Sequence, residues 1–221
     1  MRVTAVLAAI SCLTTCGLAE EAKVPLKTEI PEEVLAGTPP DVLAMLFPGL
    51  EKPLTELPTL LVPQGTVNLA RGKKVTSSDP RPVIGELAFL TDGNRAGTEE
   101  SYVELGPMAQ WVQIDLGAPS KIYALYLWHF FREARSYHDV IIQVADDAEF
   151  SKNVRTVYNN DQDNSSGKGI GKDRPYIETN FGRLIDAKGA TGRYVRLSSN
   201  GNTANDLNHY IEVEVFGKPA S

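Results

Sequence analysis

Ionisable and aromatic side chains gather in one short stretch of the sequence, WHFFREARSYHDV, from Trp128 to Val140. It holds two of the chain's three histidines, two arginines, two acids and four aromatic residues. Histidine exchanges protons near neutral pH or binds a metal, whereas arginine stays protonated and pairs with carboxylate or sulfate groups. The stretch is therefore compatible with a catalytic centre, a metal site, a binding surface or two strand ends that are merely polar.

Catalytic motifs are scarce in the rest of the sequence. Zinc held by His129, His138 and His209 would form a three-histidine site with an open position, but no HExxH or similar short spacing accompanies these residues. A serine nucleophile lacks its GxSxG turn, and GKGIGKD lacks the Lys-Ser/Thr pair of a phosphate-binding loop. A binding surface is favoured, and a histidine–zinc hydrolase is the weaker alternative.

Two polar loops can add to such a surface. The first is YNNDQDNSSGKGIGKDRPY, residues 158–176, and the second is SNGNTANDLNHY, residues 199–210. Long irregular loops often carry function, and side-chain amides suit sugar recognition because they both donate and accept hydrogen bonds. Asn164, Asn205 and His209 are therefore candidate ligand contacts, although asparagines are also ordinary turn residues.

The elements that must position these residues read as strands. Apolar and polar residues alternate with a period of two in four segments, and a fifth, KIYALYLWH, is a longer and nearly continuous apolar run; Gly, Asn and Asp separate the segments. No segment after Val67 has a sustained helical period, which favours an antiparallel sandwich or barrel. The segments are QWVQIDLG, KIYALYLWH, HDVIIQVADD, GRYVRLSSNG and HYIEVEVFG.

The first 65 residues differ in character from the strands. Residues 1–19 have the order of a secretory signal, and a lipid anchor at Cys16 is the alternative. Residues 20–65 carry eight of the 14 prolines, which predicts an extended arm with one or two helical turns in PDVLAMLF. The net charge of -6 and the absence of a basic stripe argue against a nucleic-acid partner.

Five strings together carry a family resemblance, and they cover residues 66–218. NLARGKKVTSS and LTDGN are followed by WVQIDLG, RYVRLSSNG and YIEVEVFG. In this order they resemble the discoidin family, also called the coagulation factor five/eight type C domain, which is related to carbohydrate-binding module family 32. The resemblance implies an all-β fold, an eight-stranded antiparallel jelly-roll β-sandwich of the galactose-binding-like type, with ligands bound by loops at one end.

The resemblance also implies a structural Ca²⁺ ion beside the loop that contains Asp92 and Gly93. Calcium takes six to eight oxygen ligands, and the loop and the last strand offer carboxylates, carbonyls and a hydroxyl. Without the resemblance, Asp-Gly would be an ordinary turn and Glu212 an exposed strand residue. The implied ligands are Leu90, Asp92, Asn94, Thr98, Ile211 and Glu212.

In sugar-binding members of the family, the loop between two central strands contacts the ligand. Here that loop offers His129, Arg132, Arg135 and Tyr137 but lacks the family's asparagine, which puts galactose in doubt. Its arginines favour an acidic or sulfated glycan. We therefore expect an exported, non-catalytic module that binds glycan or another extracellular polymer. The alternative is an adhesion or scaffold module for a cell-surface protein or phospholipid, and the polar loop tips disfavour lipid.

Overall fold

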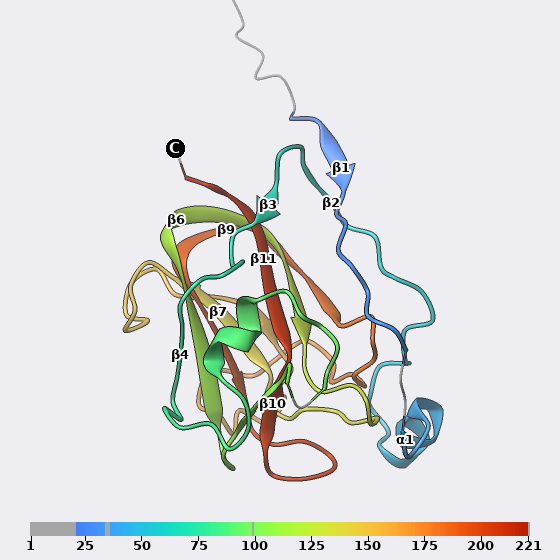
Figure 1. Ribbon diagram of the computed structural model, residues 1–221. Coiled ribbons are helices and arrows are strands. Elements are labelled where there is room, and N and C mark those ends of the chain that lie inside the picture. The colour runs from blue at the N-terminus through green and yellow to red at the C-terminus, as the bar shows by residue number, and fades with distance from the viewer. Residues whose placement is uncertain (1–20, 34–35, 99, 221) are drawn as a thin grey trace, which may run out of the picture.

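The fold comes from a computed structural model that describes residues 21–33, 36–98 and 100–220 (Figure 1). The predicted signal at residues 1–19 and its two cysteines lie outside this range. Within the described ranges, no helix is long and apolar enough to cross a membrane.

Strands dominate the described residues. The one α-helix, α1, spans Pro40–Leu46, inside the segment where the sequence predicts one or two helical turns, and a 3-10 helix, η1, spans Leu87–Thr91. The strands are β1 (Lys23–Pro25), β2 (Leu61–Pro63), β3 (Val67–Asn68), β4 (Val75–Ser77), β5 (Val103–Leu105), β6 (Gln110–Trp128), β7 (Ile141–Ala145), β8 (Arg155–Asn159), β9 (Arg183–Ser199), β10 (Asn208–Tyr210) and β11 (Glu212–Pro219).

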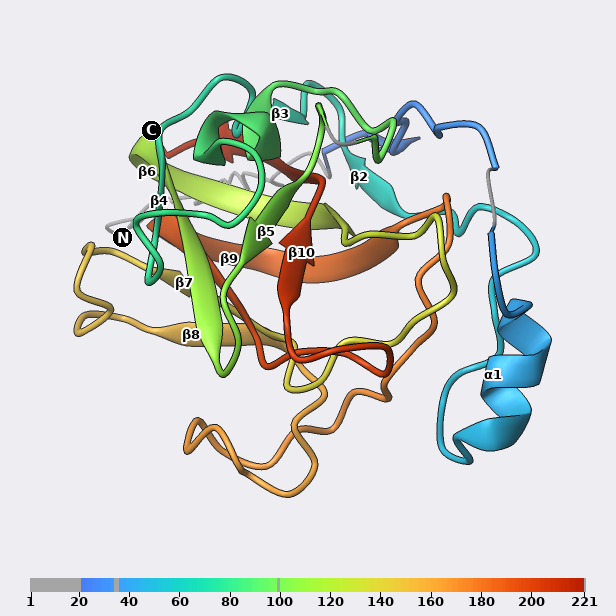
Figure 2. The same cartoon turned by 60° about the horizontal axis from the view of Figure 1, so that its bottom comes forward.

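The main sheet has the order β3-β11-β6-β9-β7-β8, with β4 also paired to β6, and all of its ladders are antiparallel. Strands β6 and β9 are long, and their pairing shifts register between Asp115 and Ser120. Before the shift β6 pairs with β4, and after it β6 pairs with β11. The two halves contribute to opposite layers of a sandwich (Figures 1 and 2), which confirms the predicted antiparallel β-sandwich.

The core lies between these layers. Residues that the alternating pattern places on one face, such as Ile114, Ile142 and Leu197, are fully buried in it. Burying one such side chain contributes about 1.5–3 kcal/mol. On β11, Val213 and Val215 join this core, as the pattern predicts, whereas Ile211 packs in a second cluster on the outer side of the sheet.

The second cluster explains why KIYALYLWH is apolar almost without interruption. Strands buried on both faces have near-continuous apolar runs. Tyr126 and Trp128 of β6 stack at 5.1 Å on the outer face, where Leu26, Ile30 and Val62 of the Pro-rich arm cover them. Residues 21–33 and 36–65 thus run along the sandwich, and their apolar side chains cover part of its outer face (Figure 1).

Backbone and side-chain contacts fix the arm along its length. Thr28 donates a hydrogen bond to Glu214 at 2.5 Å, and Asn180 donates one to the carbonyl of Pro31 at 3.0 Å. Further along, Arg183 holds the Glu51 carboxylate with two hydrogen bonds of 2.5 and 3.0 Å. The arm is attached both to the last strand and to the beginning of β9.

Candidate functional site

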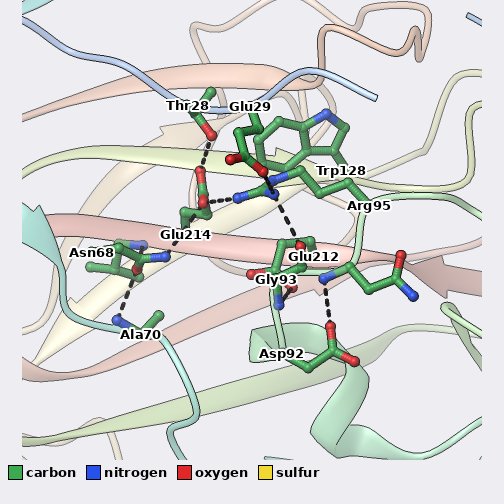
Figure 3. A network of polar contacts seen from close by, with 12 residues as sticks. Thr28, Glu29, Asn68, Ala70, Asp92, Gly93, Arg95, Trp128, Glu212 and Glu214 are labelled. Atoms are coloured by element: carbon green, nitrogen blue, oxygen red, sulfur yellow. Dashed lines mark hydrogen bonds and ion pairs between the residues drawn. The ribbon is translucent and has the colours of Figure 1, made fainter. Parts of the chain in front are cut away.

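The outer face of β11 carries a buried polar network where the arm meets the loop after η1 (Figure 3). Glu214 forms an ion pair with Arg95 and also accepts hydrogen bonds from Thr28 and Asn68. The Arg95 guanidinium lies 5.3 Å from the centre of the Trp128 ring. The charge of Arg95 is therefore largely neutralised inside the protein.

Glu212 differs from Glu214 because one of its two carboxylate oxygens has no hydrogen-bond partner. One carboxylate oxygen, Oε2, accepts the Gly93 N–H at 3.0 Å, but the buried Oε1 has no hydrogen-bond partner. Burial raises the pKa of Glu212 to about 8, against the hydrogen bond from Gly93 and the charge of Arg95, and repulsion from Glu214 and Asp92 adds to the rise. An unpaired buried carboxylate of this kind would be stabilised by a proton or a cation.

Without the family resemblance Glu212 would be an ordinary exposed strand residue, but in the structure both Glu212 and Glu214 are buried. Glu212 has no exposed surface and Glu214 is 3% exposed. The physical reason is that two segments cover the outer face of β11. The arm lies over Glu214 through Thr28, and the loop after η1 lies over Glu212 through Gly93.

The loop with the implied calcium ligands lies beside β11, as the resemblance implies. A Cβ added to Gly97 would lie only 3.1 Å from the Ile211 side chain. Asp92 accepts the Asn94 N–H at 2.7 Å, and the Thr98 hydroxyl lies 3.2 Å from that of Ser101. Leu90 is fully buried in η1.

The donor set fits a calcium ion in its chemistry. Two carboxylates, Asp92 and Glu212, stand close enough for one to raise the pKa of the other. The unpaired Glu212 Oε1 is the kind of hard oxygen ligand that calcium prefers. Arg71 also reaches this loop, since its guanidinium occupies the space that a Cβ on Gly93 would need.

Four of the predicted ligand contacts lie in the interior. His129, Arg135, Tyr137 and His209 are each at most 4% exposed. His129 Nδ1 lies 2.7 Å from Glu178 Oε1, and its ring stacks on Tyr137 with centroids 4.2 Å apart. In this structure these side chains hold the loop 129–139 in place and do not face solvent.

Tyr137, His209 and Glu104 form a hydrogen-bonded chain. Tyr137 Oη lies 2.9 Å from His209 Nδ1, and His209 Nε2 lies 3.0 Å from Glu104 Oε2. Burial, with repulsion from Arg135 and His129, lowers the pKa of His209 to about 3. The imidazole is therefore neutral. Because Glu104 can only accept when ionised, we assign the proton to Nε2, and Tyr137 donates to Nδ1.

Arg135, the second arginine of the predicted binding loop, also has partners inside the protein. Arg135 forms an ion pair of 2.5 Å with Glu133 and lies 4.7 Å from the centre of the Phe130 ring. Its aromatic and acidic neighbours account for its burial. Arg135 therefore stabilises the loop from within.

The structure does not assemble the zinc site. His138 is exposed, whereas His129 and His209 are buried. Among the described residues, the one group of three or more His, Cys, Asp or Glu side chains with metal-ligand spacing is Asp139, Asp161 and Asp163, which contains no histidine. His129 and His209 serve packing and hydrogen bonding instead.

Arg132 is the predicted contact that reaches an open cavity. The cavity has a volume of about 360 Å³ and lies between the arm and the sandwich. Arg132 is partly exposed, and one of its terminal nitrogens donates to the Ala96 carbonyl at 3.2 Å. Three segments line the cavity, namely residues 29–32 of the arm, residues 93–96 after η1, and Arg132.

Asn164 and Asn205 lie elsewhere, and neither lines this cavity. Both are exposed, but their side-chain oxygens accept backbone hydrogen bonds, from Gly169 and Leu207 respectively. Their loops meet at Asp139, which accepts hydrogen bonds from Ser165 and Asn200. The seven predicted contacts are thus divided between the interior, the cavity and a separate pair of loops.

Sequence reasoning missed Glu29 and Glu32, which the arm brings to the cavity wall. Their position depends on contacts between residues far apart in the chain, such as Thr28 with Glu214. The acidic, Pro-rich composition of EIPEE gives no sign of this partner. The unbroken apolar run of β6 was the available signal, since it requires a cover on the outer face.

No protein-family model matches the chain, and no curated protein does. Several solved structures are similar. A family 89 glycoside hydrolase from Clostridium perfringens, in complex with its substrate GlcNAc-alpha-1,4-galactose, is 17% identical with a TM-score of 0.52. The similarity covers 70% of this chain but only 15% of the hydrolase.

Two smaller proteins are also similar to this chain. The CBM32 of AlyQ, in complex with 4,5-unsaturated mannuronic acid, is 22% identical over 65% of this chain and 93% of its own, with a TM-score of 0.48. The lectin domain of lectinolysin, complexed with Lewis B antigen, is 19% identical over 70% and 98%, with a TM-score of 0.49.

These similarities concern the fold. The structure has the antiparallel β-sandwich that the sequence predicted, and part of the family 89 glycoside hydrolase shares this fold.

Proposed function

We propose that the protein is a non-catalytic module that binds glycan in the cavity around Arg132. The observation that carries the proposal is the cavity itself. It lies beside the loop that follows Trp128, and its volume of about 360 Å³ is within the range of small-ligand sites. The fold and the sequence resemblance support this choice of ligand class.

Arg132 supplies the directional contacts. A guanidinium has five N–H donors, and one of those of Arg132 donates to the Ala96 carbonyl. Its remaining donors suit sugar hydroxyls, and Asn94 on the same cavity wall offers an amide that donates and accepts. A guanidinium is a poor proton-transfer group, so the role of Arg132 is to bind and orient a ligand.

The buried histidines support a non-catalytic role for the site. A general acid or base must come within hydrogen-bond reach of its substrate. His129 and His209 lie in the interior, where His129 Nδ1 contacts Glu178 and the two ring nitrogens of His209 contact Tyr137 and Glu104.

A glycan array with the mature chain, followed by titration of each hit, tests the proposal. Arg132→Ala is expected to weaken binding about tenfold, because a hydrogen bond to a charged group contributes about 1.5–3 kcal/mol. Arg155→Ala is the matched control, since Arg155 is an exposed arginine that does not line the cavity. Absence of any glycan hit, or equal affinity of both variants and the parent, would contradict the proposal. Binding to phospholipid vesicles or protein alone would support the adhesion alternative.

We also propose a structural calcium ion at Asp92 and Glu212, with Leu90, Asn94, Thr98 and Ile211 as further oxygen donors. The support is the buried unpaired oxygen of Glu212. A bound ion would join the loop after η1 to β11. Metal analysis of the purified protein tests this directly. Absence of calcium, together with an unchanged unfolding curve in its presence, would refute the assignment.

Finally, we propose that the protein is exported and that residues 1–19 are removed. The sequence order of Arg2, an apolar run and small residues before Glu20 supports this proposal. Lipid modification at Cys16 is the competing outcome.

A further inference from the structure

We propose that the Pro-rich arm is a wall of the ligand pocket and that its glutamates make the pocket select neutral or amine-bearing glycans over anionic ones. This inference rests on the proposed glycan-binding function. It assigns ligand selection to Glu29 and Glu32, which lie outside the five strings that carry the family resemblance.

The arm is held in position on both sides of the cavity. Thr28 hydrogen-bonds to Glu214 before the cavity-lining residues, and the Ala36 N–H donates to the Arg132 carbonyl at 2.7 Å after them. Between these points, Asn180 binds the Pro31 carbonyl. The backbone that carries Glu29 and Glu32 is therefore anchored to the sandwich by three described contacts.

The side chains that line the cavity give it an excess of exposed negative charge. Arg95 lines the cavity, but its side chain is 9% exposed and its charge is matched by Glu214, whose side chain is 4% exposed. Glu29 approaches Arg95 only at 3.8 Å, with its own side chain 95% exposed. Setting the Arg95–Glu214 pair aside, two exposed carboxylates, Glu29 and Glu32, face one partly exposed cation, Arg132.

This balance reverses the ligand preference that the loop sequence predicts. The sequence counts Arg132 and Arg135 as two free cations, which favours an acidic or sulfated glycan. In the structure Arg135 is buried against Glu133 and Phe130, so its charge does not face the cavity. The arm instead brings two carboxylates, Glu29 and Glu32, to the cavity wall. A uronate or sulfate in the cavity would meet like charge, whereas hydroxyls and ammonium groups would find acceptors.

Paired probes separate the effect of charge from that of sugar shape. We would immobilise glycan families that differ only in one substituent, namely a neutral N-acetylated oligosaccharide, its free-amine counterpart, and a uronate oligosaccharide of equal length. The parent chain is compared with Glu29→Gln, Glu32→Gln and the double variant. Glu33→Gln is the matched control, since it removes an exposed arm glutamate that does not line the cavity.

The double variant is expected to change the ratio of amine to uronate affinity about tenfold in favour of uronate. Two exposed charges are removed, and the removal of each has effects of opposite sign on the affinities for the two ligands. The change should shrink in 1 M salt, where the Debye length is about 3 Å. The Glu33→Gln control should leave the ratio unchanged.

The possible results are distinguishable. If the parent chain binds no glycan, the proposed function fails. If the parent binds glycan and Arg132→Ala weakens it, but the double variant behaves like Glu33→Gln, only the role of the arm is refuted. A parent chain that prefers uronate or sulfate ligands would also overturn the inference. Circular dichroism spectra and melting curves of all variants must agree, so that a folding defect is not read as altered selection.

Discussion

The clearest test of the buried network is the pH dependence that Glu212 gives to stability in the absence of calcium. The folded-state pKa of this carboxyl is raised to about 8 from an ordinary value of 4.5. Between these values the folded protein holds a proton that the unfolded chain has lost. Stability must therefore fall as the pH rises through this window, because the slope follows the difference in bound protons.

The magnitude follows from the two pKa values. One full proton of difference changes the free energy of unfolding by about 1.4 kcal/mol for each pH unit. The slope flattens as the pH approaches 8, so Glu212 by itself should cost about 1.7 kcal/mol between pH 6.5 and 8. His209 acts in the opposite sense, because its unfolded form has an ordinary pKa of 6.5 and still loses about half a proton in this window, which offsets about 0.4 kcal/mol of that loss.

Urea unfolding at 25 °C in a calcium chelator, at several pH values, measures this loss. Glu212→Gln removes the titrating group while retaining an oxygen for the Gly93 N–H, so its stability should be nearly constant across the same window. Glu33→Gln, an exposed control, should keep the slope of the parent. Free calcium at about 100 times its Kd should add about 2.7 kcal/mol to the parent and nothing to Glu212→Gln. A flat pH profile for the parent, or an equal slope in Glu212→Gln, would refute the reasoning.

Further outcomes are expected elsewhere in the molecule. Because burial lowers the folded-state pKa of His209 to about 3, His209 should contribute a loss of about 1.4 kcal/mol per pH unit as the pH drops from about 6 to 4, which opposes the gain from Glu212 above pH 4.5. The parent and the exposed control His138→Gln should share one pH profile, and His209→Gln should depart from it by this amount; equal profiles in all three would contradict the assignment. Glu51→Ala leaves the half-buried guanidinium of Arg183 without its two hydrogen bonds, so it should lower the free energy of unfolding in urea by about 2 kcal/mol. Glu56→Ala, an exposed control on the arm, should lower it little, and equal effects of the two variants would contradict the anchoring role. Intact-mass measurement of the native exported protein should lack the first nineteen residues, and a lipid-modified cysteine at its N-terminus would reject that cleavage.

The fold could be predicted because its determinants are local or repeated. Period-two segments around Ile114, Ile142 and Val213 identify strands without knowledge of their partners, and these residues are buried as the pattern requires. The five motif strings add the topology. Local patterns of this kind tell which face of a strand is apolar. The nearly continuous apolar run of KIYALYLWH in β6 indicates that both faces of that strand are buried.

The candidate site was predicted less well, because burial of polar side chains depends on distant partners. His129, Arg135 and His209 are side-chain types that usually lie at the surface or in active sites, and nothing in their spacing shows that Glu178, Glu133 and Glu104 neutralise or bind them. Arg132, by contrast, is partly exposed and lines the cavity. Whether a polar residue faces solvent was decided by segments more than a hundred residues away, as for Glu212 under Gly93.

The attachment of the arm to β11 also has a consequence for the order in which the molecule folds during synthesis. The arm emerges early, but Thr28 must wait for Glu214, which is 186 residues further along the chain. Until β11 has been made, the arm lacks one of the strands that hold it over Tyr126 and Trp128. Contacts of such long range slow folding and prolong the exposure of apolar surface. We therefore expect a nascent chain that ends before β11 to be prone to aggregation and to bind chaperones along the KIYALYLWH strand.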